Sequence, residues 1–214
     1  AKELLAFKGN LNFFNLKSID DKALEVLSQR PNYEYQRVDL KRLARLTNKQ
    51  LKSILAEKNS GYLSLELTEL NPELARILAA YDGEFHLNNK VSLSNECFDI
   101  LIEKIVEQGV YNGVIGQLST LTPHQANVLS ERLEEDDFTQ LLSDLPGMDV
   151  PLATWLVNNQ KEIICGPDVN LEVIEVLAGH DGRLEFRKLK DLSPKLASAL
   201  SHYDGELHFI WGPS

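Results

Sequence analysis

The chain has 214 residues, of which 43% are hydrophobic, so it can bury a sizeable core. Its formal charge of −10 and its pI near 5.0 argue against nucleic-acid binding, because neutralising phosphates requires clustered Lys and Arg. The basic stretch at residues 37–45 is too short to change that expectation. No apolar run approaches the roughly 20 residues of a membrane span, which predicts that the chain does not insert into a membrane.

The N-terminal part predicts two repeats of a strand followed by a helix. The first opens at Leu11, and Asp20 is expected to cap its helix. A second strand is predicted at Tyr33-x-Tyr35, with a charged insertion before the next helix starts at Thr47. Residues 4–13 match the end of the last repeat, which favours a chain cut from a longer array.

Residues 63–87 show the repeat most clearly. Leu63 and Leu65 alternate as in a strand with one buried face. Asn71 supplies an N-cap oxygen, and Pro72 follows at the first helical position, where its missing N–H costs nothing. A Tyr-Asp-Gly sequence ends this helix and recurs in the last repeat, and its glycine is predicted to be left-handed.

The pattern loosens after the fourth repeat, which opens at Phe85 and caps its helix at Ser94. In the fifth repeat, the strand at residues 114–116 is either weak or missing altogether, and a helix is predicted to start at Thr122. The sixth repeat places three apolar residues where other repeats have strand and post-strand leucines: Phe138, Leu142 and Leu145.

The final repeats restore the pattern. Ile163-x-Cys165 predicts a strand, and Asn170 caps the helix that follows. The last complete repeat, residues 184–209, starts its helix at Ser193. The closing strand, Leu207-x-Phe209, has no helix after it, so its edge is expected to be exposed and able to pair.

A strand and a helix this short cannot bury both apolar faces alone, so the repeats must stack. We therefore predict an α/β fold, a right-handed solenoid of repeats of about 22–28 residues with a parallel sheet on one side and helices on the other. Residues 1–214 are expected to form this single domain, with an irregular segment over about residues 109–162.

The L-x-L spacing before an (Asn/Ser/Thr)-Pro helix start resembles the leucine-rich repeat family, and in particular its bacterial leucine-rich-repeat-like variants. The ladder asparagine that usually follows the strand in that family is not regularly placed here, and the helix start is more regular than the strand. The resemblance covers the whole chain, most strongly residues 63–87 and 184–209. It implies a partner-binding surface on the sheet and brings no catalytic residues or cofactor with it.

Residues between the inward leucines are expected to lie on the outer face of the sheet, where the resemblance places partner contacts. An ordinary solvated surface is the competing interpretation of each position. The candidate partner-binding residues are Asn12, Phe14, Glu34, Ser64, Glu66, His86, Asn88, Glu185, Arg187 and His208.

Other chemistry in the sequence has structural explanations. Cys97 and Cys165 occupy leucine positions of the repeat, which predicts buried thiols rather than a disulfide or metal site. His180 and His202 stand beside Asp-Gly helix ends, where a cation favours the negative pole of the helix. The acidic run at residues 131–137 is expected to be a solvated helix end. No phosphate loop, nucleophile motif or paired-Cys metal motif is present.

Three functions stay open on the sequence. The first is a noncatalytic scaffold that binds a protein partner, or associates with itself, through its sheet face or terminal edges. The second is a structural spacer within a longer repeat protein. The third is an enzyme with a site in the irregular middle segment. No cofactor is predicted for any of them.

Overall fold

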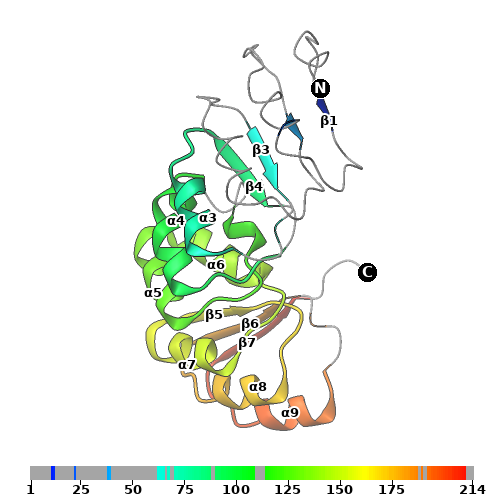
Figure 1. The fold of residues 1–214 in the computed structure, drawn as a ribbon. Coiled ribbons are helices and arrows are strands. Elements are labelled where there is room, and N and C mark those ends of the chain that lie inside the picture. Colours follow the sequence, from blue (N-terminus) through cyan, green and yellow to red (C-terminus); the bar gives the residue numbers. More distant parts are fainter. Residues whose placement is uncertain are drawn as a thin grey trace. The chain divides into compact units, whose positions relative to one another are not determined.

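The chain folds into mixed helices and parallel strands whose contacts separate into two units, Ala1–Gln117 and Leu118–Ser214. The computed structural model describes residues 11–12, 22, 38–39, 62–65, 67, 70–87, 90–108, 114–187, 189 and 192–210. Figure 1 shows the described elements of both units. Each unit contains its own sheet, and no described helix is long and apolar enough to cross a membrane.

The first unit holds four parallel strands that pair in chain order: β1 (Leu11–Asn12), β2 (Val38–Asp39), β3 (Tyr62–Leu65) and β4 (Glu84–Leu87). Leu11 is in register with Val38, and Leu63 is in register with Phe85. The strand positions predicted at Leu11, Leu63 and Phe85 are therefore confirmed.

The second strand differs from the prediction. It lies at Val38–Asp39, and Asp39 pairs with Ser64, so Asp39 takes the register position that was assigned to Glu34. Tyr33-x-Tyr35 and Val38-x-Leu40 alternate equally well, so the pattern alone could not choose between them. Residues 33–35 lie outside the described part of the chain.

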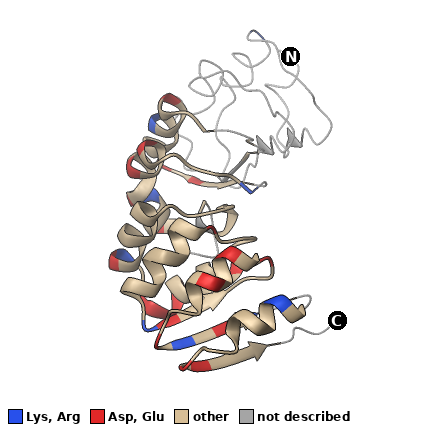
Figure 2. Ribbon diagram, turned by 90° about the horizontal axis from the view of Figure 1, so that it is seen from below, with Lys and Arg blue, Asp and Glu red and all other residues tan. Residues whose placement is uncertain are grey.

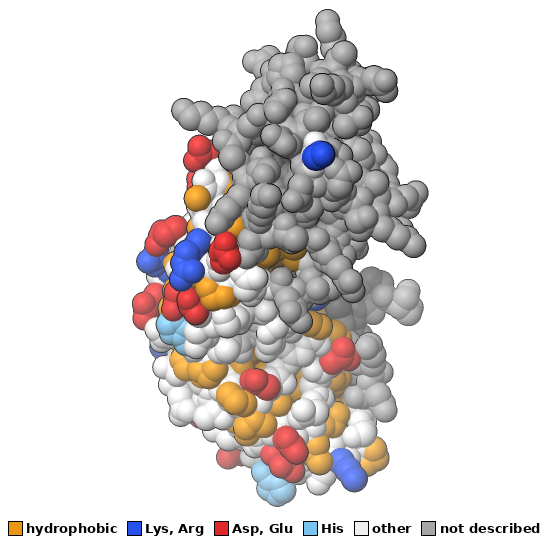
Figure 3. All heavy atoms as spheres, viewed as in Figure 1, with side chains coloured by type: hydrophobic (Ala, Val, Ile, Leu, Met, Phe, Trp, Pro, Cys, Tyr) orange, Lys and Arg blue, Asp and Glu red, His pale blue; other side chains and the backbone are white. Residues whose placement is uncertain are grey.

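Helices α3 (Pro72–Ala79) and α4 (Asn95–Gln108) belong to the first unit and begin where the sequence predicts. The Asn71 side chain accepts a hydrogen bond from the N–H of Leu74, and Ser94 Oγ accepts one from the N–H of Cys97. The Leu74 and Leu78 side chains are buried. On the outside, Arg76 on α3 pairs with Glu96 on α4. Acidic and basic side chains adjoin one another on the face of the molecule shown in Figure 3.

The irregular segment is helical in its described part, which has no strand between Leu87 and Glu162. It contains a short 3-10 helix, η2, and three α-helices: η2 (Ile115–Gln117), α5 (Pro123–Arg132), α6 (Glu135–Asp144) and α7 (Val150–Asn159). The fifth repeat's strand at residues 114–116 is thus missing, which is the second of the two alternatives, because η2 occupies most of these residues. Phe138 and Leu142, two apolar positions of the sixth repeat, line the buried side of α6.

The ends of these middle helices follow local signals. Thr122 and Gln125 form a reciprocal capping box at the start of α5, as the Thr-Pro sequence suggested. The acidic run ends α5 and fills the first turn of α6, where carboxylates favour the positive helix pole. Its assignment to helix ends is confirmed.

The second unit restores the strand–helix alternation. Its elements are β5 (Glu162–Cys165), α8 (Leu171–Leu177), β6 (Arg183–Arg187), α9 (Pro194–Leu200) and β7 (Glu206–Ile210). The three strands are parallel, and Ile163, Leu184 and Leu207 are in register. Asn170 and Ser193 cap α8 and α9 as predicted. Figure 1 shows α7, α8 and α9 along one side of this sheet.

The glycines that follow α8 and α9 are needed for a different reason from the one predicted. Gly205 does not have the left-handed φ predicted for its Tyr-Asp-Gly sequence, and Gly182 does not have one either. A Cβ at Gly182 would lie 2.0 Å from the carbonyl oxygen of Lys161, and a Cβ at Gly205 would lie 2.3 Å from that of Gly182. These glycines therefore allow consecutive repeats to approach closely.

An aromatic residue two positions before each of these glycines makes a hydrogen bond to the preceding repeat. His180 Nε2 lies 3.2 Å from the Lys161 carbonyl oxygen, and the Tyr203 hydroxyl donates to the Gly182 carbonyl at 2.8 Å. Burial, reinforced by the Asp181 carboxylate, raises the pKa of Tyr203 and so favours the protonated donor. His180 is buried and contacts another repeat, whereas His202 is exposed after the end of α9.

Both cysteines are buried and free, as predicted from their leucine positions. Cys97 Sγ lies 3.2 Å from the carbonyl oxygen of Leu70, its hydrogen-bond acceptor. Cys165 lies in β5, and burial raises the pKa of its thiol from 9.0 to about 12.

The Cys165 thiol should make the protein lose stability at alkaline pH. Its pKa is higher in the folded state, so the folded chain retains a proton that the unfolded chain releases. The free energy of unfolding should fall by about 1.4 kcal/mol per pH unit from this group between pH 9 and about 12. Urea unfolding at pH 8, 9 and 10 measures the slope, and Cys165→Ala supplies the control without the thiol. Equal slopes in the two proteins would contradict the prediction.

Candidate functional site

The outer face of the β5-β6-β7 sheet gathers most of the charge that the three strands carry. We call it the charged sheet face, and it consists of Glu162, Ile164, Arg183, Glu185, Arg187, Glu206, His208 and Ile210. Strand pairing arranges these residues in rows, with Glu162, Arg183 and Glu206 in one row and Ile164, Glu185 and His208 in the next. Acidic and basic positions follow one another along these strands in Figure 2.

A buried carboxylate lies at the centre of this face. The Glu185 side chain is 1% exposed, and each of its oxygens binds a different arginine of the same strand. Arg183 Nη2 donates to Glu185 Oε2 at 2.7 Å, and Arg187 Nε donates to Glu185 Oε1. Arg183 also pairs with Glu162 on β5 through Nη1, at 3.1 Å. Glu185 therefore fixes two guanidinium groups whose positive charges compensate its own burial.

The side of this face on β7 is more open. Glu206 is 67% exposed, and its carboxylate lies 2.7 Å from Nε2 of His208. Ile210 is 47% exposed and is in register with Arg187. An exposed aliphatic side chain thus stands beside a partly exposed arginine.

The structure locates the predicted partner-binding residues unevenly. Arg187 and His208 lie half-buried on the charged sheet face. Glu185 lies on that face too, but it is 1% exposed, as is Ile164 beside it in the same row, so the centre of the face differs from the expected open surface. Both oxygens of Glu185 bind the flanking arginines. It can position Arg183 and Arg187 but cannot itself contact a partner.

The remaining predicted residues belong to the first unit. His86 is half-buried in β4 and in register with Ser64, while Asn12 lies in β1. Only the backbone is described for Asn12 and Ser64. Four of the predicted residues lie outside the described part of the chain: Phe14, Glu34, Glu66 and Asn88.

Sequence reasoning missed one row of the charged sheet face. Glu162, Arg183 and Glu206 each begin their strands one residue before the apolar residue taken as the start. The sequence did contain a signal for this row, because the alternation of outward residues, Arg183-x-Glu185-x-Arg187, includes the first residue of the strand.

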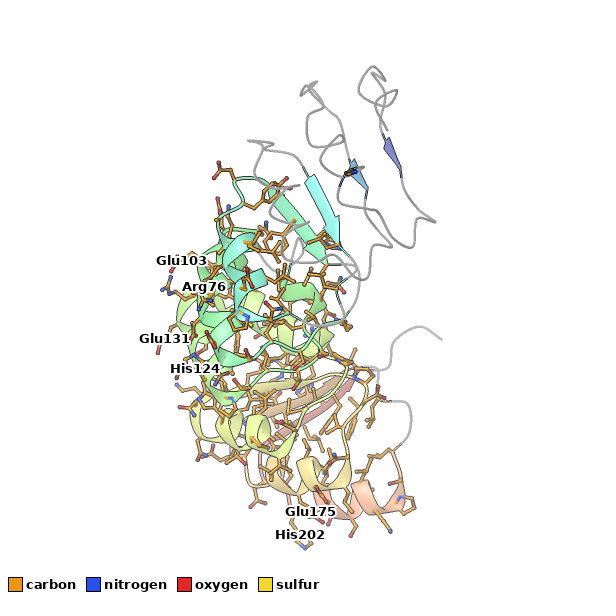
Figure 4. All side chains as sticks on the ribbon, viewed as in Figure 1. Arg76, Glu103, His124, Glu131, Glu175 and His202 are labelled. Carbon is orange, nitrogen blue, oxygen red and sulfur yellow. The ribbon has the colours of Figure 1, made fainter. Side chains whose placement is uncertain are left out.

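The irregular segment contributes little chemistry in its described part. Its buried polar side chains are those of Gln125 and Ser143, and both make hydrogen bonds within helices or their caps. Within this segment, the exposed Glu131 points outward from α5 in Figure 4. Among the described residues, no three His, Cys, Asp or Glu side chains are grouped to hold a metal ion.

What the charged sheet face can do chemically is recognition. It presents oriented guanidinium groups and an exposed aliphatic side chain, both of which suit contact with another macromolecule. Comparison with known proteins finds no family model, no curated protein and no solved structure that matches this chain.

Proposed function

We propose that this chain is a noncatalytic α/β solenoid that binds a protein partner through the charged sheet face. Parallel strands paired in chain order, with capped helices between most of them, support the solenoid in each unit. The observation that carries the binding proposal is the fixation of Arg183 and Arg187 by the buried Glu185 carboxylate.

Stability alone does not explain this network. Replacing a buried ion pair with apolar residues is often neutral or stabilising, so such a pair contributes little net stability. Arg183 Nε is in addition buried without a hydrogen-bond partner among the described residues, which is unfavourable. A network with these costs suits a binding role, because arginines held in place lose less entropy when a partner binds.

The proposal predicts a partner whose binding depends on Arg187 and Ile210. Partners captured by photocrosslinking from the charged sheet face would be purified, and their affinity measured by calorimetry. Arg187→Ala combined with Ile210→Ala should weaken binding by about tenfold or more, since oriented arginines and exposed apolar groups dominate interfaces.

The matched control is Arg76→Ala, which removes an exposed, ion-paired arginine from α3. It should leave the affinity unchanged. A partner that binds the double variant as tightly as the original chain would exclude this face as its binding site.

A spacer within a longer repeat array is the second candidate. Leu207 in β7 is half-buried, although the residues in register with it, Leu184 and Ile163, are completely buried. One more repeat, or the edge of a second copy, would cover Leu207 in the way that each repeat covers its neighbour.

A further inference from the structure

We infer that Arg187 recognises a carboxylate of the partner, and that this carboxylate stands next to an aliphatic side chain. The inference rests on the proposed function and adds the chemistry of the partner. It follows from three features of the charged sheet face: the way Arg187 is held, the residue beside it, and the charges around it.

Arg187 is held by one edge of its guanidinium group. Its Nε donates to the buried Glu185 carboxylate, while its Nη groups have no acceptor among the described residues. The side chain is 31% exposed, and its Nη atoms are not buried. The end formed by Nη1 and Nη2 therefore faces solvent and can bind both oxygens of one carboxylate.

The neighbour of Arg187 is apolar. Ile210 lies opposite Arg187 on β7, at the separation of adjacent strands, roughly 4.8 Å. Ile210 is the exposed large hydrophobic residue of the described part of the chain. A ligand whose carboxylate meets Arg187 would therefore cover Ile210 with whatever side chain comes next, and burial favours an aliphatic one.

The surrounding charges favour a single carboxylate. Glu162 and Glu206 stand at the opposite end of the neighbouring strands β5 and β7, where they pair with Arg183 and His208. The net charge of −10 repels ligands that carry many negative groups. Polyanions such as nucleic acid or phosphorylated segments are therefore disfavoured, whereas one Asp, Glu or C-terminal carboxylate fits beside Arg187.

Selection from displayed random peptides tests the inference with the full 214-residue chain as bait. One library presents internal peptides, and the other presents peptides with a free carboxyl terminus. Enriched peptides should carry a carboxylate next to Ile, Leu or Val. Enrichment confined to the second library would identify a terminal carboxylate as the source.

Variants of Arg187 give the decisive comparison. Arg187→Gln should lower the affinity for an enriched peptide about tenfold, and Arg187→Glu should shift the selection toward Lys and Arg peptides. Arg187→Lys keeps a positive charge near Glu185 and should still bind several-fold more weakly, because an ammonium group lacks the free Nη end. Arg76→Gln is the control, and thermal unfolding verifies that each variant is folded.

The outcomes separate the two proposals. If the enriched peptides lack a carboxylate but lose binding in Ile210→Ala, the inference fails and the face remains a binding face. If the original chain, Arg187→Gln and Ile210→Ala all bind the enriched peptides equally, the inference and the proposed function both fail.

Discussion

Gly182→Ala should lower the free energy of unfolding by about 3 kcal/mol or more. The new methyl group would lie 2.0 Å from the Lys161 carbonyl oxygen and 2.6 Å from His180 Nε2. The carbonyl cannot easily move away, because it accepts a hydrogen bond from the N–H of Arg183 where β6 begins. The clash would therefore separate two consecutive repeats.

Gly147→Ala supplies the matched control for this substitution. A Cβ at Gly147 would have its nearest neighbour, the Asp168 carbonyl oxygen, at 3.6 Å, which is an ordinary contact. Its effect should stay within about 1 kcal/mol. Gly205→Ala repeats the test, because its Cβ would lie 2.3 Å from the Gly182 carbonyl oxygen. If urea unfolding finds Gly182→Ala as stable as Gly147→Ala, the consecutive repeats do not approach each other so closely.

Removing both arginines that bind Glu185 should also be strongly destabilising. In Arg183→Met with Arg187→Met, the apolar stems are retained but a carboxylate that is 1% exposed loses its positive partners. Breaking a buried ion pair in this way costs about 3–5 kcal/mol. Adding Glu185→Met to the double variant should restore at least half of that loss, because no buried charge is then left uncompensated.

Arg76→Met is the reference for an exposed pair. Arg76 and Glu96 are both well exposed, so losing their ion pair should change the free energy of unfolding by less than about 0.5 kcal/mol. Chemical unfolding of the four proteins measures the differences. If the double variant is no less stable than Arg76→Met, the Glu185 carboxylate is not held by the arginines as the structure indicates.

Local sequence signals predicted the regular parts of both units. Asn71, Thr122, Asn170 and Ser193 accept hydrogen bonds at helix starts because capping depends on residues within one turn. The strand positions at Leu63 and Leu184 followed from alternation with a period of two. Signals of this kind need no knowledge of distant residues.

Predictions failed where a pattern allowed two arrangements. Alternating residues at 33–35 and 38–40 could each form the second strand, and pairing with β1 and β3 selected Val38–Asp39. Phe138 and Leu142 fit the apolar spacing of the repeat and also one face of a helix, so the sequence left open whether the sixth repeat keeps a strand. The glycines at helix ends were correctly located, but their role came from a neighbouring carbonyl that no local pattern reveals.

The candidate site, like the fold, could be predicted from the sequence only in part. From the sequence alone, alternation placed Glu185, Arg187 and His208 on one face of a strand–helix repeat, because the direction of a side chain from a strand is a local property. Only the tertiary structure decided that Glu185 is buried between two arginines while Ile210 stays exposed beside Arg187. Burial and ion pairing depend on which strands and side chains lie alongside, and that is settled when the repeats pack together.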